Sequence, residues 1–327
     1  MMTQTIVDAT VIKDAVELAC RAPSLHNSQP WRWVAGSAAV DLFADPHRMA
    51  TSTDSSGRES IISCGAALDH FRVAMAAVGW EADWDQFPNP NNPNHLASID
   101  FAPMDYVTQA RRDRAAAILR RRTDRRPFHA PRDWTSFEPV LRSSYDNDLA
   151  ALSVLTDDAR PRLAEASRLT ESLRRYDDLY HRELGWWTAP SRESEGIPAS
   201  ALVPEAKGGT LNRRFLANGY TREDSPGAHD QAKILVLSTP EDTRADALNC
   251  GEALSAVLLE CTIAGLAACT VTHVTELEAG RDIVRDLIPG AAAVPQVLIR
   301  VGAEPAGKGV LEPTPRRPVQ EVLEIRG

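Results

Sequence analysis

Arginine residues gather densely in one part of this chain. Eight arginines fall between positions 111 and 126, and residues 120–128 read RRRTDRRPF. Guanidinium groups bind phosphate through paired hydrogen bonds, and the Thr123 hydroxyl can add a further one. A basic helix face in solvent is one alternative, above all for residues 111–114, and a nucleic-acid groove is another. The run has no interleaved aromatic residues and no second basic tract of similar density, so nucleic acid is disfavoured.

A second basic motif lies near the C-terminus, where residues 315–318 read PRRP. The two prolines stiffen the chain around Arg316 and Arg317, so less entropy is lost when these arginines close on an anion. The alternative is a solvated tail. Either arginine could therefore serve as a second anion contact.

A polar turn near the N-terminus holds the third group of candidate residues. Residues 21–33 read RAPSLHNSQPWRW, with prolines that separate a helical stretch from an aromatic strand. Such a turn exposes backbone N–H groups and supports Ser24, Asn27 and Gln29 as hydrogen-bond donors and acceptors. A plain connector between a helix and a strand is the alternative.

These motifs need elements that position them, and the chain repeats one such element. Residues 63–80 (SCGAALDHFRVAMAAVGW) align without a gap with residues 249–266 (NCGEALSAVLLECTIAGL), so that Gly65 matches Gly251 at an offset of about 186 residues. Both segments carry apolar residues at helical spacing and end on a glycine. The early glycine lets another backbone come close. Chance similarity between two alanine-rich helices is the alternative.

Similar elements flank the two predicted helices. An apolar hairpin-like stretch at 31–43 precedes the first, a strand at 233–238 precedes the second, and a further strand is expected at 294–301. Each half would then set a central helix against a sheet. We therefore expect a mixed fold, α+β with α/β character, in which two related halves of one chain pack like the subunits of a twofold dimer.

The halves are expected at 1–119 and 120–327. A lid insertion is expected at about 186–230, because long polar loops inside a compact domain are often functional covers.

Composition and charge limit the class of protein. The chain has 327 residues, 43% of them hydrophobic, which is enough for a core without staples. The net charge of −9 disfavours nucleic acid and anionic membranes as partners. Five scattered cysteines without ligand spacing predict neither a disulfide framework nor a metal site. The N-terminus lacks a signal-peptide pattern, so a cytoplasmic location is expected.

One apolar stretch, residues 253–271, is nearly long enough to span a bilayer. Glu260 lies at its middle, where a charge opposes insertion. A buried helix of a soluble protein is therefore expected there, and no membrane is expected as a partner.

Together the motifs resemble those of the nitroreductase superfamily of FMN flavoproteins. APSLHNSQPWRW is similar to the APSxxNxQPW turn of that family, and RRTDR is similar to its RRSxR motif, with Thr123 in place of serine. PRRPVQEV resembles its C-terminal basic-x-Arg-x-Pro stretch, and CGEAL…AGLAAC resembles its dimer-core helix and following strand. The likeness covers most of the chain apart from the long loops. The order of motifs looks closest to the actinobacterial Acg group of NAD(P)H nitroreductases, which is linked to dormancy.

The resemblance implies one FMN site per chain. Family members are usually homodimers in which each site takes the RRSxR and C-terminal motifs from one subunit and the NxQPW turn from the other. This chain has one copy of each motif. One FMN per chain, and a monomer that imitates the dimer, are therefore expected.

The resemblance also implies roles for individual residues. The RRTDR segment would meet the phosphate, the ribityl chain and the pyrimidine edge, while Arg316, or Arg317 in its place, would complete the phosphate clamp. Many relatives carry a Pro-x-Glu-Gly stretch whose backbone reaches the flavin N5; residues 270–273 stand there in this chain, and His273 either covers the ring or donates a proton. No catalytic protein residue and no metal ligand is implied. The expected cofactor-binding residues are Pro23, Ser24, Leu25, Asn27, Gln29, Arg121, Arg122, Thr123, Arg125, Val271, Thr272, His273, Arg316 and Arg317.

Two functions follow from the resemblance. The first is an oxidoreductase, in which NAD(P)H delivers a hydride to FMN and the flavin then reduces a nitro compound or a quinone. The second is a protein that holds FMN without turnover, as a store or a sensor, with a lid over the flavin. His273 and the long segment 188–207 motivate the second function.

Overall fold

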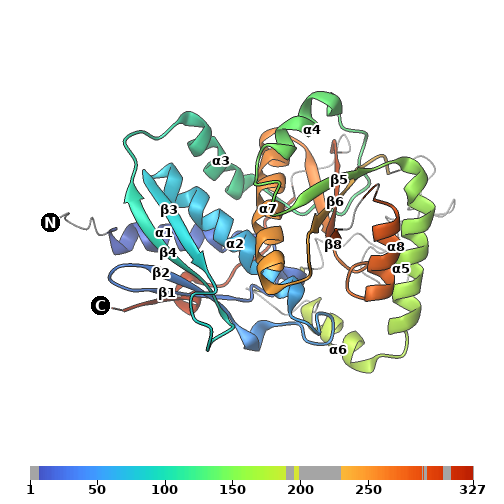
Figure 1. The fold of residues 1–327 in the computed structure, drawn as a ribbon, viewed down its shortest axis with the longest axis horizontal. Coiled ribbons are helices and arrows are strands. Elements are labelled where there is room, and N and C mark those ends of the chain that lie inside the picture. The colour runs from blue at the N-terminus through green and yellow to red at the C-terminus, as the bar shows by residue number, and fades with distance from the viewer. Residues whose placement is uncertain are drawn as a thin grey trace.

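Two long helices lie between two β-sheets at the centre of the molecule (Figure 1). The computed structural model describes residues 7–188, 195–198, 230–288, 290, 293–304 and 311–326. The expected mixed α+β fold is confirmed, since each sheet packs on helices within its own part of the molecule.

The first sheet has five strands in the order β3-β4-β2-β1-β9. The pairs β1–β2, β2–β4 and β3–β4 are antiparallel, whereas β9 runs parallel to β1. Its strands are β1 (Trp31–Ala35), β2 (Val40–Ala44), β3 (Trp80–Gln86), β4 (His95–Pro103) and β9 (Leu323–Ile325). Its helices are α1 (Ala9–Ala19), α2 (Arg58–Ala77), α3 (Gln109–Arg120) and α9 (Val319–Val322).

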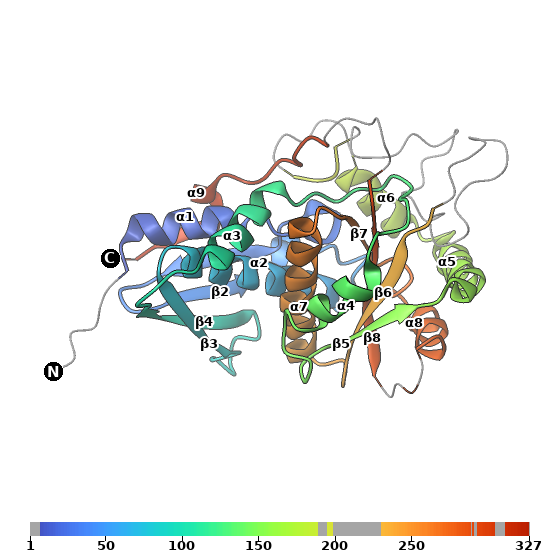
Figure 2. The ribbon, with the colours of Figure 1, turned by 90° about the horizontal axis from the view of Figure 1, so that it is seen from above.

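The second sheet has four antiparallel strands in the order β5-β6-β8-β7. Helices α5 and α8 cover its outer side (Figure 2), where their apolar residues pack on β6 and β8. Its strands are β5 (Ala151–Leu155), β6 (Lys233–Thr239), β7 (Ala267–Val271) and β8 (Val294–Gly302). Its helices are α4 (Trp134–Arg142), α5 (Arg160–Arg174), α6 (Asp178–Trp187), α7 (Arg244–Ile263) and α8 (Glu278–Asp286).

Helices α2 and α7 touch through the two glycines that the internal repeat singled out. A Cβ atom on Gly65 would lie 2.1 Å from the Leu248 carbonyl oxygen, and one on Gly251 would lie 2.1 Å from the Ile62 carbonyl oxygen. Ile62 and Leu248 are matching positions of the repeat, so the contact is reciprocal. Reciprocal contacts of this kind are the signature of a twofold interface. Only glycine allows the two backbones to approach this closely.

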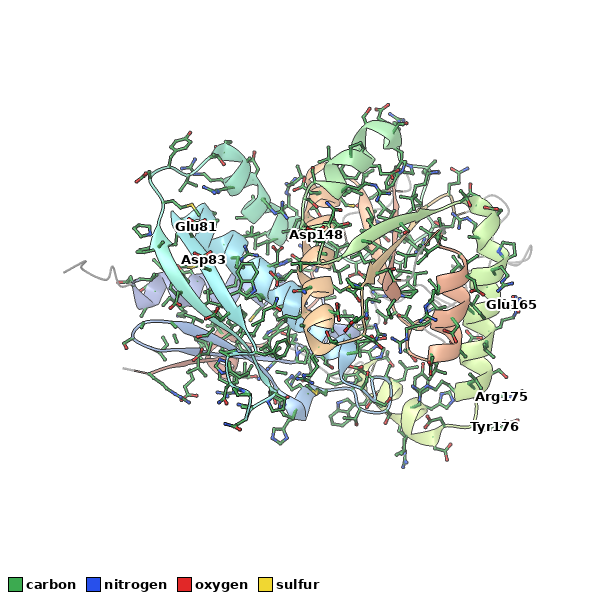
Figure 3. All side chains as sticks on the ribbon, in the orientation of Figure 1. Glu81, Asp83, Asp148, Glu165, Arg175 and Tyr176 are labelled. Atoms are coloured by element: carbon green, nitrogen blue, oxygen red, sulfur yellow. The ribbon has the colours of Figure 1, made fainter. Side chains whose placement is uncertain are left out.

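The two central helices, α2 and α7, are also alike in that most of their residues are buried. The rings of Trp31 and Trp33 on β1, and of Phe71 on α2, are fully buried in the core beside the first sheet. Charged side chains such as Glu81 and Asp83 on β3 lie on the outside of the molecule (Figure 3).

The apolar stretch at 253–271 is divided between two elements, since α7 ends at Ile263 and β7 begins at Ala267. Within the part of the chain that the structure describes, no helix is both long enough and apolar enough to cross a bilayer.

The C-terminal segment departs from a simple division into consecutive halves. Strand β9 returns to the first sheet and pairs with β1, with Leu323 opposite Trp33. The division at 119/120 stays a prediction, and β9 crosses it. Most of the expected lid at 186–230 lies outside the described residues. Within that range the structure describes 186–188, 195–198 and 230.

Candidate functional site

A cleft of about 1030 Å³, a volume that includes the open solvent at its mouth, lies where α2 and the turn after α1 meet the second sheet. Its walls come from the turn after α1, the first turns of α2, the segment after α3 and the end of β7. The remaining lining residues are Leu184 on α6, Ile197, Leu254 on α7, Glu276 and Val297 on β8. Residues far apart in the sequence therefore share one cavity.

Eight of the fourteen residues expected to bind a cofactor line this cleft. The other six, which are absent from its lining, are Asn27, Gln29, Arg121, Arg122, Arg316 and Arg317. The structure thus brings the N-terminal turn, the RRTDR segment and the end of β7 to one place, while the contacts of each residue with a cofactor stay predictions. The eight are Pro23, Ser24, Leu25, Thr123, Arg125, Val271, Thr272 and His273.

The N-terminal turn is held in an unusual backbone conformation. His26, Asn27 and Gln29 have φ values of +50°, +56° and +53°, in the left-handed region that L-residues seldom occupy. Hydrogen bonds fix the turn: the Gln29 N–H donates to Ser24 Oγ, and the Leu25 N–H donates to Ser63 Oγ, each at 3.1 Å. Backbone strain of this kind persists where surrounding contacts hold it, and it clusters at functional sites.

Asn27 and Gln29 dock the C-terminal segment. Asn27 Nδ2 donates to the carbonyl oxygens of Gly196, at 2.9 Å, and Pro315, at 3.1 Å. The Arg317 N–H donates to Gln29 Oε1 at 2.9 Å. The two amides of the turn therefore set the path of the segment that carries Arg316.

The geometry separates the two arginines of the PRRP motif. Arg316 Nε donates to the Cys20 carbonyl oxygen at 2.7 Å, and its Nη2 donates to the Arg21 carbonyl oxygen at 3.1 Å. Arg317 Nη2 instead donates to the Glu321 carbonyl oxygen at 3.0 Å. Arg316 therefore lies at the end of α1, where the charge of Arg121 acts on it, while Arg317 is engaged with α9.

Arg21, Arg121, Arg122 and Arg316 form an arginine cluster beside the cleft. Arg121 is 6% exposed, and its Nη2 donates to the Arg21 carbonyl oxygen at 3.3 Å. Burial lowers the pKa of Arg121 to about 10, with the charges of Arg21 and Arg122 acting in the same direction. Burial also lowers the pKa of Arg316, followed by the charges of Arg121 and Arg21.

The arginine cluster holds more positive charge than its surroundings neutralise. Within the described ranges, neither Arg121 nor Arg316 forms an ion pair with a carboxylate, and Arg121 Nε is buried without a hydrogen-bond partner. Buried like charges without a counterion are unfavourable unless an anion joins them. The cluster adjoins the cleft, because Thr123 follows Arg122 and lines it. The arrangement therefore suits a ligand with a phosphate at one end.

The RRTDR segment and the start of β7 lie side by side. Thr123 forms an isolated parallel bridge with Ala268, and the Asp124 N–H donates to the Ala268 carbonyl oxygen at 3.0 Å. Two residues beyond the end of β7, His273 Nε2 lies 2.9 Å from Ser167 Oγ on α5, which orients the imidazole at the cleft wall.

The sequence analysis missed Glu59, Ile62 and Ser63, which line the cleft from the first turns of α2. Glu59 is 3% exposed. The sequence offered one signal for Glu59. It lies shortly before the apolar repeat at 63–80, and a carboxyl at a buried position is unusual.

The internal repeat relates this cleft to a second place, which side chains fill. At the same offset, Ser63 corresponds to Asn249 and Thr272 to Gln86, and Gln86 Nε2 donates to Asn249 Oδ1 at 2.6 Å. Close by, the Arg72 guanidinium lies 3.5 Å from the centre of the Trp84 ring. The two matching places therefore differ, since one is open and the other is packed.

Comparison with known proteins finds close relatives along the whole chain. A Mycobacterium tuberculosis protein named "Putative NAD(P)H nitroreductase acg" is 55% identical over 327 residues, covering 99% of this chain and 98% of the relative. A second M. tuberculosis protein named as an NAD(P)H nitroreductase is 38% identical, covering 97% of this chain and 92% of the relative. No family model matches the chain.

Among solved structures, the FMN-dependent nitroreductase NfnB from Mycobacterium smegmatis, in complex with NADPH, is 18% identical. The match covers 65% of this chain and 97% of that chain with a TM-score of 0.40, which is too low to support an argument. The curated relatives are decisive, because their identity extends over almost the full length of both proteins. The chain belongs to the nitroreductase family, as a member of its Acg group.

Proposed function

We propose that the protein is an FMN-dependent oxidoreductase that takes electrons from NAD(P)H and reduces a nitro compound or a quinone. Bound FMN would accept and donate the hydride, so the chain needs no nucleophile of its own. The arginine cluster would hold the phosphate, with Arg316 rather than Arg317 as the C-terminal contact. Thr123 and Arg125 would meet the ribityl chain and the pyrimidine edge, and residues 271–273 would lie along the ring.

The arginine cluster carries this proposal. Four guanidinium groups gather without carboxylate partners for Arg121 and Arg316 in the described part of the chain, at the edge of a cleft lined mainly by apolar and polar uncharged groups. FMN has a dianionic phosphate at one end and a flat, largely apolar ring at the other. The charge and shape of the site fit that combination.

We further propose one FMN per chain and a monomer that imitates a dimer. Two observations support this: the reciprocal Gly65–Gly251 contact, and the filled place that the repeat relates to the cleft. A cytoplasmic location and a link to dormancy also stay predictions. Mass spectrometry of the intact complex under native conditions tests the stoichiometry, and two FMN per chain or a stable dimer would contradict it.

The second candidate function is FMN storage or sensing without turnover, and the cleft mouth favours it. Leu184 and Ile197 line the cleft, and the Ile197 N–H donates to the Trp187 carbonyl oxygen at 2.8 Å. Arg48 forms an ion pair with Glu195. These contacts fix Glu195 and Ile197 against the described part of the chain, with Ile197 in the wall of the cleft, where it would narrow the space open to a nicotinamide.

The visible spectrum of the purified protein distinguishes the two functions. A flavin absorption band shows that FMN is bound. Anaerobic addition of NADH or NADPH should bleach that band within seconds if the protein is an oxidoreductase. A band that dithionite bleaches, but neither nicotinamide does, supports storage or sensing. A colourless protein that does not bind added FMN at micromolar concentration would contradict both functions.

A further inference from the structure

Glu59 is a carboxylic residue that the proposed function has not used, although it lines the cleft. It lies in the first turn of α2 and is 3% exposed. Its backbone N–H donates to Asp54 Oδ1 at 3.1 Å, which fixes the start of the helix and hence the position of the side chain. The carboxyl is therefore placed by the fold rather than by contacts of its own.

The Glu59 carboxyl is incompletely paired. Its Oε1 lies 3.3 Å from Arg58 Nη2, while its Oε2 is buried and has no hydrogen-bond partner in the part of the chain that the structure describes. Arg58 is shared among several acceptors, since its Nη1 and Nη2 donate to the carbonyl oxygens of Gln296 and Thr275, each at 2.8 Å. A buried carboxylate whose ion-pair partner is shared with other acceptors is unfavourable, so the neutral acid is favoured although a Thr272 hydrogen bond opposes it.

We propose that Glu59 donates a proton to the electron acceptor bound in the cleft, an inference that rests on the proposed oxidoreductase function. Reduction of a quinone to a hydroquinone consumes one hydride and one proton. Reduction of a nitro group to a nitroso group and water consumes the same pair. The hydride would come from the nicotinamide by way of the flavin.

In the donating step the O–H bond of the neutral carboxyl breaks and its electron pair stays on the carboxylate oxygen. The proton forms a new O–H bond on the reduced acceptor. Water at the open mouth of the cleft then returns a proton to Glu59. The atoms and electrons balance without any further reactant.

The surroundings of Glu59 suit a group that exchanges its proton near neutral pH. Burial raises the pKa of Glu59 to about 7, while Arg58 opposes the rise and Asp54 adds to it. Smaller effects from Thr272 and Arg281 lower the pKa. A general acid works best when its pKa lies near the working pH. Other titratable groups on the same cleft are His26, Arg125, Cys269, His273 and Glu276.

Glu59→Gln tests the proposal, because it keeps the shape of the side chain and removes the exchangeable acid proton. Glu252→Gln is the matched control. Glu252 is also a carboxyl with a pKa raised by burial, to about 8, but it pairs with Arg72 at 3.0 Å and does not line the cleft. Any effect of losing a buried carboxyl in general should appear in both variants.

The first readout does not depend on activity. An infrared pH titration of the carboxylic-acid C=O stretch should show a group that titrates near pH 7 in the wild type and in Glu252→Gln. A second component from Glu252, with a pKa of about 8, should be present in the wild type and missing in Glu252→Gln. Glu59→Gln should lose the component near pH 7 and keep that of Glu252. A Glu59 that titrates in the ordinary range of an exposed glutamate would overturn the proposal.

The second readout starts from protein that dithionite has already reduced, so it does not require that NAD(P)H reacts. On mixing with a naphthoquinone, Glu59→Gln should oxidise at least about 100-fold more slowly than wild type and lose the decline in rate above about pH 7. FMN occupancy should be unchanged. A variant that matches the wild-type rate and pH profile refutes the role of Glu59.

Failure of the proposed function gives a different result. If NAD(P)H leaves the flavin oxidised, while dithionite-reduced protein still transfers electrons with a profile that depends on Glu59, the nicotinamide step is wrong and the role of Glu59 stands. If reduced protein transfers electrons to neither quinones nor nitro compounds, both proposals are wrong.

Discussion

Replacing Arg316 with alanine tests the phosphate site most directly. Its guanidinium lies against the carbonyl oxygens of Cys20 and Arg21 and next to Arg121. A charge-assisted hydrogen bond to a sequestered phosphate is worth about 1.5–3 kcal/mol. Since about 1.4 kcal/mol is a tenfold change, Arg316→Ala should weaken FMN binding by about 10- to 150-fold.

The same substitution should have little effect on the FMN-free protein. Without FMN, the Arg316 charge is disfavoured by burial and repelled by Arg121 and Arg21, and these causes, in that order, lower its pKa. Removing it relieves that repulsion but loses the bonds to the carbonyl oxygens. The two effects oppose each other, so the free energy of unfolding should change by no more than about 1 kcal/mol.

Urea unfolding with and without saturating FMN, together with fluorescence titration of FMN, measures both effects. Arg317→Ala is the control, because Arg317 lies on the same C-terminal segment but binds Glu321 instead of joining the arginine cluster. It should weaken FMN binding by less than about fivefold. If Arg316→Ala bound FMN as the wild type does, or if Arg317→Ala lost more affinity, the assignment of the phosphate site would be refuted.

Four further substitutions probe the fold and the site. Gly65→Ala should destabilise the protein by about 1–3 kcal/mol in urea unfolding, because its Cβ would meet a backbone oxygen at 2.1 Å. Gly185→Ala, with nothing within 4 Å, should stabilise it by up to about 1 kcal/mol, and equal effects would refute the argument. Glu59 has a folded pKa of about 7 against 4.5 unfolded, so its favourable contribution is complete below pH 4.5 and is lost as the pH rises toward 7. Relative to the wild type, the free energy of unfolding of Glu59→Gln should therefore rise by up to about 3 kcal/mol across that pH range. A difference in stability that does not change with pH would contradict the raised pKa. Asn27→Ala should speed hydrogen exchange in residues 314–318, because it removes the donor to Pro315; unchanged exchange would show that the arm is held elsewhere.

The long elements were predictable because their causes are local. The repeated apolar pattern and the early glycine of residues 63–80 and 249–266 predicted two helices that touch, and the structure confirms the contact at Gly65 and Gly251. The strands at 233–238 and 294–301 are likewise confirmed as β6 and β8. Strand β9 was not predicted. It has three residues, and its only reason to be a strand is the distant edge of β1 that it pairs with.

The candidate site likewise has residues that the sequence predicted and residues that only the structure revealed. The sequence by itself marked the N-terminal turn, the arginine run and the PRRP motif as candidate binding segments, because proline, polar turn residues and clustered arginines limit what those segments can do locally. The resemblance to the nitroreductase family implied that they share one site, and the structure brings the turn and the RRTDR segment to one cleft. Only the tertiary structure decided that Arg316 faces the arginine cluster and Arg317 does not, and that Asn27 and Gln29 hold the C-terminal arm. The position of Glu59 in the cleft was also decided only by the tertiary structure. Its pKa depends on burial between segments more than 200 residues apart, such as α2 and Thr272, and no local pattern of residues encodes that burial.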